Sequence, residues 1–308
     1  RAKPARIISN QRVPQPQLTD LFMREGYLEY VDPMDWRQFM IAVRKLADNF
    51  NYGTDHSPFL GSGVEYVQSR RYQYGDPVRS IDWRVTARTG KVFVKEFETP
   101  KRMPAYILFD TSASMIVSSQ PRSKYATALH IAGGLAFACL DRVSPVGLLT
   151  TGVEEYRIEP SLSKDTVMQW LHELRRFKLD DQTLLGDRLT RLGSRLASRA
   201  LIIVLSDLHD PDAIAALKLT AQQHDLIVMQ MVDPAEGSLR GAGFFRAREP
   251  ETGREYITSG AAQRLDPGLI ETELKRGGID HIVINTAVPF AHQVRWFFES
   301  RGGLGGAR

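Results

Sequence analysis

The chain has 308 residues, with 40 Lys and Arg against 36 Asp and Glu, which gives a formal net charge of +4. Its 43% hydrophobic and 25% charged residues are typical of a globular protein and exclude wholesale disorder. The single cysteine, Cys139, excludes an intramolecular disulfide and a multi-cysteine zinc site, and it fits a reducing compartment. No apolar run approaches the roughly 20 residues that a membrane-spanning helix needs.

The positive excess lies in the first third of the chain. Residues 1–103 hold 17 basic and 12 acidic side chains, whereas residues 104–308 hold 23 basic and 24 acidic ones. The window 70–102 alone has nine basic and four acidic residues, a balance of +5. An asymmetry of this kind indicates two functional parts.

The first part of the chain predicts a flexible leader followed by one helix. Residues 1–20 are rich in Pro and Gln and lack the apolar segment of a signal peptide, and a first residue other than Met leaves the native N-terminus open. Apolar residues at helical spacing predict a helix over 33–49, with Asp32 as its N-cap, that docks on the chain's own core. Residues 51–64 have the composition of a loop, and a strand is expected over 92–97.

After Pro104, short apolar runs alternate with longer helical patterns. The expected strands are 105–109, 146–150, 153–158, 201–205, 226–232 and 279–285, and the expected helices are 124–141, 164–177, 184–198, 212–224 and 288–300. This alternation predicts an α/β domain in which helices cover both faces of a mostly parallel, Rossmann-like sheet. A hairpin is expected within 241–258, with its turn at 251–253.

The sequence therefore divides into four parts. We expect a leader with the N-terminal helix at 1–52, a basic region at 53–103, the α/β domain at 104–301 and a frayed, Gly-rich tail at 302–308.

Polar side chains gather where strands of the predicted sheet end. In an open α/β sheet, ligands bind at the carboxyl ends of the strands. Two carboxylates and three hydroxyls come from three loops at that edge: Asp110, Ser112, Ser114, Thr183 and Asp207. Such a set of hard oxygen ligands suits Mg²⁺ or Mn²⁺.

The neutral hydroxyls in this set have a chemical consequence. If Ser112, Ser114 and Thr183 form the inner shell, much of the charge of the ion stays unneutralised, while Asp110 and Asp207 orient ligands from outside. Such an ion favours an incoming carboxylate. The site therefore suits capture of a Glu or Asp from a partner better than bond breaking.

Each of these residues also has a simpler interpretation as a helix cap. Asp110 and Ser112 could cap the helix after the first strand, Thr183 the helix at 184, and Asp207 the helix near 211. The position of Asp110 and Asp207 at two strand ends favours the metal site over these alternatives.

The pattern resembles the metal-ion-dependent adhesion site (MIDAS) of von Willebrand factor A domains. Upstream, residues 71–84 (RYQYGDPVRSIDWR) and 87–90 resemble the signature of the bacterial family catalogued as domain of unknown function 58, in which this signature precedes an A-type domain. Residues 249–255 resemble another recurring stretch of that family. The resemblance covers about residues 60–300.

The resemblance implies a von Willebrand factor A-like fold with an N-terminal basic α+β extension. It also implies a cytoplasmic, non-enzymatic partner of MoxR-type AAA+ ATPases that acts in chaperone-like assembly or metal insertion and binds an acidic residue of the ATPase or of a client protein. The chain departs from many A domains at Asp181-Gln182, where they have glycines, and at Ser206-Asp207-Leu208, where they have Thr-Asp-Gly.

The basic window 70–102 allows two interpretations. Its Arg and Lys residues with interleaved aromatics could form a nucleic-acid surface. Alternatively, Arg79, Arg84 and Arg88 could pair with acidic groups such as Asp76 and Asp82. We favour ion pairs or a protein surface, because charges of both signs are interspersed there.

A metal-dependent hydrolase is a further alternative. The seven histidines show no metal-binding spacing, and the sequence contains neither Gly-x-Ser-x-Gly nor a phosphate-binding loop. No general base is visible beside the triplet that begins at Asp110, so we expect no enzymatic activity.

Overall fold

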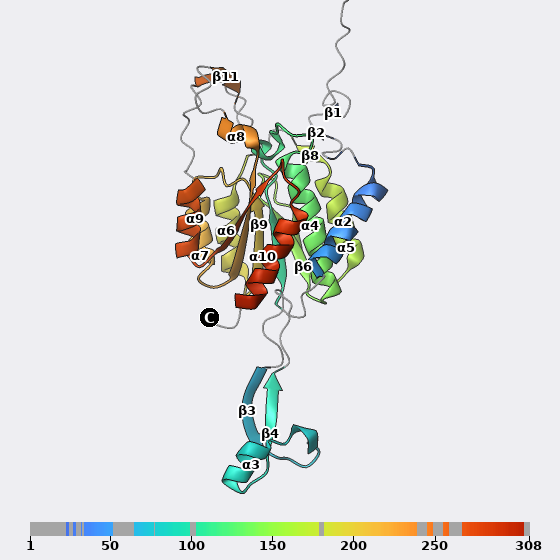
Figure 1. Cartoon of the computed structure of the whole chain (residues 1–308), viewed down its shortest axis with the longest axis vertical. Coiled ribbons are helices and arrows are strands. Elements are labelled where there is room, and N and C mark those ends of the chain that lie inside the picture. The colour runs from blue at the N-terminus through green and yellow to red at the C-terminus, as the bar shows by residue number, and fades with distance from the viewer. Residues whose placement is uncertain are drawn as a thin grey trace, which may run out of the picture.

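A computed structural model gives the arrangement of the chain (Figure 1). The structure describes residues 23–24, 27–28, 32, 34–51, 65–76, 78–98, 103–178, 182–238, 245–248, 255–258 and 267–304. The predicted leader at 1–20, nearly all of the predicted loop at 51–64 and the predicted turn at 251–253 lie outside these residues.

A six-stranded sheet forms the centre of the protein, in the order β13-β10-β9-β5-β6-β7. Five strands are parallel, and β7 pairs antiparallel with β6 at one edge. The strands are β5 (Ala105–Phe109), β6 (Val146–Thr150), β7 (Arg157–Ser161), β9 (Leu201–Ser206), β10 (Asp225–Val232) and β13 (Asp280–Asn285). The prediction of a mostly parallel α/β sheet is confirmed.

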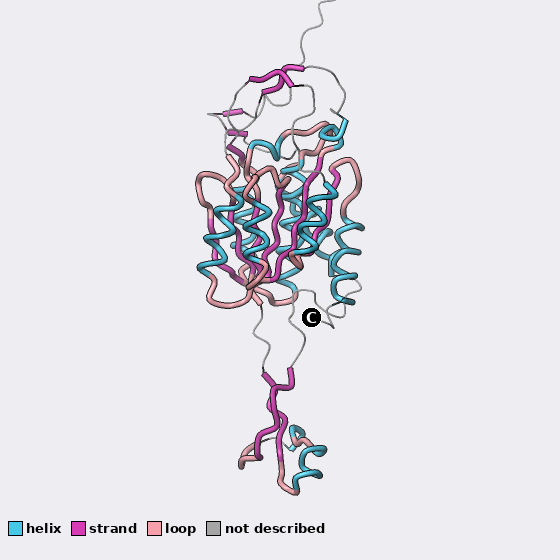
Figure 2. Tube along the Cα trace, turned by 90° about the vertical axis from the view of Figure 1, so that its left-hand side faces the viewer, coloured by secondary structure: helices cyan, strands magenta, loops and turns pink. Residues whose placement is uncertain are grey.

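Side chains of the central strands alternate between two hydrophobic clusters. In β5, Ala105, Ile107 and Phe109 belong to one cluster, whereas Tyr106 and Leu108 belong to the other. The first cluster is covered by α2 (Trp36–Asn51), α4 (Lys124–Asp141), α5 (Lys164–Leu174) and α10 (Ala291–Leu304), and the second by α6 (Leu185–Arg195), α7 (Ala213–Thr220) and α9 (Pro267–Arg276). Both faces are therefore covered by helices, as Figures 1 and 2 show.

Helix α2 docks on α4 through two adjacent glycines. A Cβ added to Gly133 would lie 2.8 Å from Val43 Cγ1, and one added to Gly134 would lie 2.9 Å from Phe50 Cε2. Val43 and Phe50 are buried in the first cluster. The expectation that this helix packs on the chain's own core is confirmed.

The start of α2 differs from the prediction. Asp35, and not Asp32, caps the helix: its carboxylate accepts from the Gln38 backbone N–H at 2.8 Å, while the Gln38 side chain accepts from the Asp35 N–H at 3.4 Å. Asp32 instead accepts a hydrogen bond from the Met34 N–H and pairs with the buried His130 of α4. Burial alone raises the pKa of Asp32, but His130 outweighs it and lowers that pKa.

Residues 65–76 and 78–98 form a separate hairpin, which we call the arm. It contains β3 (Glu65–Arg71), a 3-10 helix (Val78–Ser80), α3 (Trp83–Thr89) and β4 (Phe93–Glu98). The predicted strand at 92–97 corresponds to β4, whereas β3 and α3 were not expected. In Figure 1 the arm, with β3, β4 and α3, lies below the sheet, whereas α8 and β8 lie above it.

Smaller elements complete the fold. They are β1 (Met23–Arg24), β2 (Tyr27–Leu28) and β8 (Phe177–Lys178) in one small sheet, the antiparallel pair β11 (Phe245–Arg248) and β12 (Glu255–Thr258), a 3-10 helix (Ala113–Ile116) and α8 (Pro234–Ser238). The pair β11–β12 confirms the predicted hairpin. Among the described helices, none combines the length and apolar character needed to cross a membrane.

Several predicted boundaries shift. The edge strand β7 begins at Arg157 rather than at 153, because the guanidinium of Arg188 donates to the carbonyls of Gly152 and Val153 and holds them in a turn. Helix α5 ends at Leu174, and α10 begins at Ala291 and continues into the predicted tail.

Candidate metal centre

Asp110 lies at the carboxyl end of β5 and is fully buried. Its Oδ1 accepts hydrogen bonds from the Ser112 backbone N–H and the Thr151 hydroxyl, each at 3.0 Å. Its Oδ2 accepts from the Ser206 hydroxyl at the end of β9. The carboxylate therefore ties together the ends of three neighbouring strands, β6, β5 and β9.

Ser112 and Ser114 are buried, and their hydroxyl oxygens lie 3.0 Å apart. Ser112 precedes the 3-10 helix at Ala113–Ile116 but its side chain makes no capping hydrogen bond. The simpler interpretation of Ser112 as a helix cap is therefore wrong.

Thr183 lies in the loop before α6, and backbone contacts bring that loop to the same edge. The N–H of the next residue, Leu184, donates to the carbonyl of Thr151, whose hydroxyl bonds to Asp110. The Thr183 hydroxyl oxygen is buried and makes no hydrogen bond within the described part of the chain. Since the α6 N-cap position is Leu184, Thr183 does not cap this helix.

Asp207 follows β9, and its two carboxylate oxygens have different surroundings. Oδ2 accepts from the Lys124 ammonium at 2.7 Å and lies 3.1 Å from His209 Nδ1. Oδ1 is buried and has no hydrogen-bond partner among the described residues. The carboxylate bonds to no backbone N–H of α7, whose N-cap position is Asp212, so the helix-cap interpretation of Asp207 is also wrong.

The two aspartates carry opposite pKa shifts. Burial, and then the charge of Asp207, raise the pKa of Asp110 above its usual value. Burial alone would also raise the pKa of Asp207, but His209 and Lys124 outweigh it and hold that pKa well below its usual range. Asp207 is therefore the stronger acid of the two carboxyl groups.

These contacts test whether the predicted residues fit a divalent cation. Two buried oxygens, Asp207 Oδ1 and Thr183 Oγ1, lack a hydrogen-bond partner among the residues that the structure describes. The other oxygen ligands of the set are the hydroxyls of Ser112 and Ser114 and the carboxylate of Asp110. Buried polar atoms without a partner are costly, and hard oxygens are the ligands that Mg²⁺ and Mn²⁺ prefer. The residue set thus fits such an ion. The charge of Asp207 acts on Asp110, and the Leu184 N–H bonds to the carbonyl of Thr151. These interactions bring the predicted ligand residues to one edge of the sheet.

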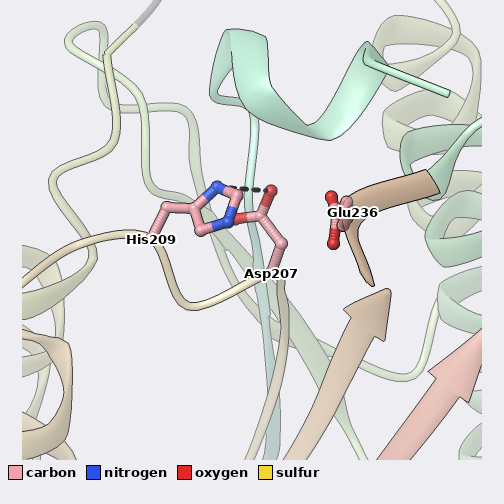
Figure 3. Close-up of side chains that lie close together, drawn as sticks. All are labelled: Asp207, His209 and Glu236. Atoms are coloured by element: carbon pink, nitrogen blue, oxygen red, sulfur yellow. Dashed lines mark ion pairs between the residues drawn. The ribbon is translucent and has the colours of Figure 1, made fainter. Parts of the chain in front are cut away.

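Three residues that the sequence did not indicate surround Asp207. Lys124 Nζ is almost fully buried and also lies 2.5 Å from Glu236 Oε1 of α8. Ligand atoms of Asp207, His209 and Glu236 lie within 4.8 Å of one another, an arrangement that could itself hold a metal ion (Figure 3). The buried ammonium of Lys124 already contacts two of these three groups. In the sequence, this arrangement is indicated by no more than a Lys at the start of a mostly apolar helix.

The loop after Asp207 has the backbone conformation of a glycine. Leu208 has φ of 59°, in the left-handed region, although it is buried. Its N–H donates to the Ser206 hydroxyl at 2.9 Å. The departure from Thr-Asp-Gly at this position therefore changes the side chain but keeps a backbone shape that glycine would adopt freely.

In the basic window, the observed basic partner of Asp76 differs from those that the sequence predicted. Arg70, rather than Arg84 or Arg88, pairs with Asp76 through two hydrogen bonds of 2.8 Å and lowers the pKa of Asp76 to about 2. The side chain of Arg79 lies outside the described part of the chain. Asp82 caps α3 and accepts from the Ser69 hydroxyl at 2.8 Å.

A comparison with known families identifies the chain. The family described as "Protein of unknown function DUF58" matches residues 68–266. The chain belongs to this family. It is 24% identical over 240 residues to the uncharacterized proteins Mb1516 of Mycobacterium bovis and Rv1480 of Mycobacterium tuberculosis, a match that covers 76% of this chain and 74% of each relative.

Two solved structures are similar to parts of this chain. BatB from Bacteroides thetaiotaomicron, described as a conserved hypothetical protein, is 14% identical with a TM-score of 0.42 and matches 65% of this chain and 99% of its own. The PilB minor pilin from Streptococcus sanguinis is 12% identical with a TM-score of 0.38 and matches 70% of this chain and 65% of its own.

Proposed function

We propose that this DUF58 protein is a non-enzymatic, divalent-metal-dependent protein-interaction module. It captures a carboxylate of a partner at the carboxyl edge of the sheet. The partner is a MoxR-type AAA+ ATPase or a client of that ATPase, and the setting is cytoplasmic, as the resemblance to von Willebrand factor A-like members implies. The ATPase supplies the hydrolysis of ATP.

The observation that carries this proposal is a pair of buried oxygens, on Asp207 and Thr183, that have no hydrogen-bond partner within the described ranges. Both belong to the five residues that follow from the strand-end pattern, and the structure leaves neither of them a capping role. A bound Mg²⁺ or Mn²⁺ would satisfy these oxygens and supply the positive charge that attracts a carboxylate from outside.

The charges around the site support capture of an acidic group. Lys124 already offsets part of the negative charge of Asp207 and Glu236. The Asp110 carboxylate accepts hydrogen bonds from the Ser206 hydroxyl, the Thr151 hydroxyl and the Ser112 backbone N–H. These bonds fix its orientation and satisfy its oxygens. A site with few free carboxylates leaves room for one that a partner provides.

Asp110→Asn tests the proposal, because it removes the charge and preserves the size of the side chain. We expect Mn²⁺ affinity, followed by electron paramagnetic resonance, to fall about 10- to 100-fold. Capture of a purified MoxR-type ATPase should require Mg²⁺ and be lost in chelator and in this variant.

Asp233→Asn is the matched control. Asp233 is a buried carboxylate at the same edge of the sheet that bonds to Ser118 and Ser119, and it is not part of the proposed site. Its replacement should leave Mn²⁺ affinity and ATPase capture unchanged. Undiminished capture in chelator would contradict the proposal.

One contact favours a second candidate, a metal-dependent hydrolase. His209 Nδ1 lies 3.1 Å from Asp207 Oδ2, and a histidine oriented by a carboxylate is the usual form of a general base. Steady turnover of p-nitrophenyl phosphate in Mg²⁺ that disappears in both Asp110→Asn and His209→Gln would establish this function in place of the non-enzymatic one.

A further inference from the structure

The tip of the arm, residues 69–95, concentrates positive charge. It carries seven basic side chains and two acidic ones, Asp76 and Asp82. Both acidic groups are used internally, since Asp76 pairs with Arg70 and Asp82 caps α3 and bonds to Ser69. Among the described contacts, neither carboxylate therefore pairs with Arg84 or Arg88.

Helix α3 exposes several of its side chains. No residue of α3 is buried, and Trp83 is 67% exposed. Arg84 and Arg88 of the same helix are exposed, and within the described part of the chain neither forms an ion pair. Asp82 caps the start of the helix, and Gly90, in the left-handed region, ends it. The helix is joined to β4 by the Thr86 hydroxyl, which accepts a hydrogen bond from the Phe93 N–H at 3.0 Å.

Exposed apolar side chains lie beside α3. The Tyr72 N–H donates to the Val92 carbonyl at 3.0 Å, and the Asp82 N–H donates to the Phe93 carbonyl at 2.8 Å. These two hydrogen bonds bring the backbone of Tyr72 beside Val92, and the backbone just before Trp83 beside the residue after Val92. All three side chains are exposed, and a group of exposed apolar side chains rimmed by polar residues is typical of an interaction surface.

We propose that this surface of the arm, formed by Tyr72, Trp83 and Val92 with Arg84 and Arg88, docks an acidic, amphipathic segment of a partner protein. Trp, Tyr and Arg are the residues most enriched among those that dominate binding energy at protein interfaces. Arg84 and Arg88, which form no ion pair with the described residues, fit carboxylates of the partner. The exposed aliphatic group of Val92 favours a protein over a nucleic acid, because it gains from apolar contact and not from phosphates.

Selection of a phage-displayed random peptide library on the immobilised full chain tests this proposal. We expect the selected peptides to be enriched in Asp and Glu interleaved with Leu, Phe or other apolar residues. A synthetic copy of the most enriched peptide should lose at least about tenfold in affinity with Trp83→Ala, and at least as much with the double variant Arg84→Glu, Arg88→Glu.

Two control variants carry matched changes elsewhere. Trp296→Ala removes a tryptophan that is 69% exposed on α10, and Arg37→Glu with Lys45→Glu reverses two exposed charges on α2. Neither should change peptide affinity. Circular dichroism should show that every variant keeps its fold, because none of the replaced side chains is buried.

Three results would overturn the proposal. One is a library selection without acidic enrichment, and another is peptide affinity that the arm variants leave unchanged. The third is tighter binding of a single- or double-stranded DNA oligonucleotide that weakens steeply with salt and is lost in the double arginine variant, which would make the arm a nucleic-acid surface.

Discussion

At the scale of single residues, Leu208 shows how the candidate metal centre constrains its backbone. A left-handed conformation costs a residue other than glycine about 1–2 kcal/mol, and Leu208 adopts it with φ of 59°. Its N–H bonds to the Ser206 hydroxyl, which in turn donates to Asp110. Strain of this kind persists where the surrounding contacts fix the geometry, as they often do at functional sites.

The most direct prediction at this scale concerns Lys124. Its buried ammonium contacts both Asp207 and Glu236, so it competes for negative charge that a metal ion would use. Lys124→Met removes this charge and keeps most of the side-chain volume. We expect Mn²⁺ affinity, measured by electron paramagnetic resonance, to rise at least about tenfold, because a unit charge a few ångströms away contributes more than the roughly 1.4 kcal/mol required.

Lys164 provides a matched control for that experiment. Like Lys124 it is the first residue of a helix, and a serine caps each helix, but Lys164 is half exposed and lies 3.8 Å from its carboxylate partner, Asp141. Lys164→Met should leave Mn²⁺ affinity unchanged. Weaker binding in Lys124→Met would mean that Lys124 positions Asp207 and does not compete with the ion.

At the scale of elements, the prediction was most accurate for segments that are buried on both faces. The strands β5 and β6 and helix α4 have the predicted bounds, because nearly every side chain in them is apolar or small and buried. Strand β3 was missed because its residues, EYVQSRR, are mostly polar, and it forms only by pairing with β4. Its pairing residues in β4 lie 22 residues away at Arg71–Phe93 and 33 residues away at Glu65–Glu98, which local periodicity cannot indicate.

Packing between α2 and α4 yields a prediction about stability. Gly133→Ala adds a methyl group 2.8 Å from Val43 Cγ1, where the helices already touch. Overpacking of a core costs about 1–3 kcal/mol, and this cost should exceed the gain of up to about 1 kcal/mol in helix propensity. We therefore expect a lower free energy of unfolding in urea, with an unchanged dependence on denaturant concentration.

Gly193→Ala is the control for this packing effect. Gly193 lies within α6, and its added Cβ would meet its nearest neighbour, Thr220 Cγ2, at an ordinary 3.5 Å. Here only the gain in helix propensity remains, so the variant should be up to about 1 kcal/mol more stable. Equal effects of the two alanines would show that the helices α2 and α4 can move apart at no cost.

At the scale of the whole molecule, topology explains which parts of the site were predictable. Asp110 and Asp207 end neighbouring parallel strands, so the order of apolar runs in the sequence brings them together. Lys124 and Glu236 reach the same place from α4 and α8. Their contact depends on how helices pack over the sheet, which follows from the tertiary structure and not from any local pattern.

The two proposed binding surfaces are attached to opposite ends of β5. The arm leads into its first residue, Ala105, and Asp110 follows its last, a distance of about 17 Å along five residues at roughly 3.3 Å each. Changes at sites this far apart, with no shared contacts, add within about 0.5 kcal/mol. We therefore expect Asp110→Asn to leave affinity for the library-selected peptide unchanged, and Trp83→Ala to leave Mn²⁺ affinity unchanged.

The double variant completes this prediction. If the ends act independently, Asp110→Asn with Trp83→Ala should lose each affinity by the amount of the corresponding single variant, and chelator should have no effect on peptide binding. Independence would allow the chain to hold an acidic segment at the arm and a carboxylate at the metal centre at the same time. A loss of peptide affinity in chelator would instead show that the two ends are coupled through the sheet.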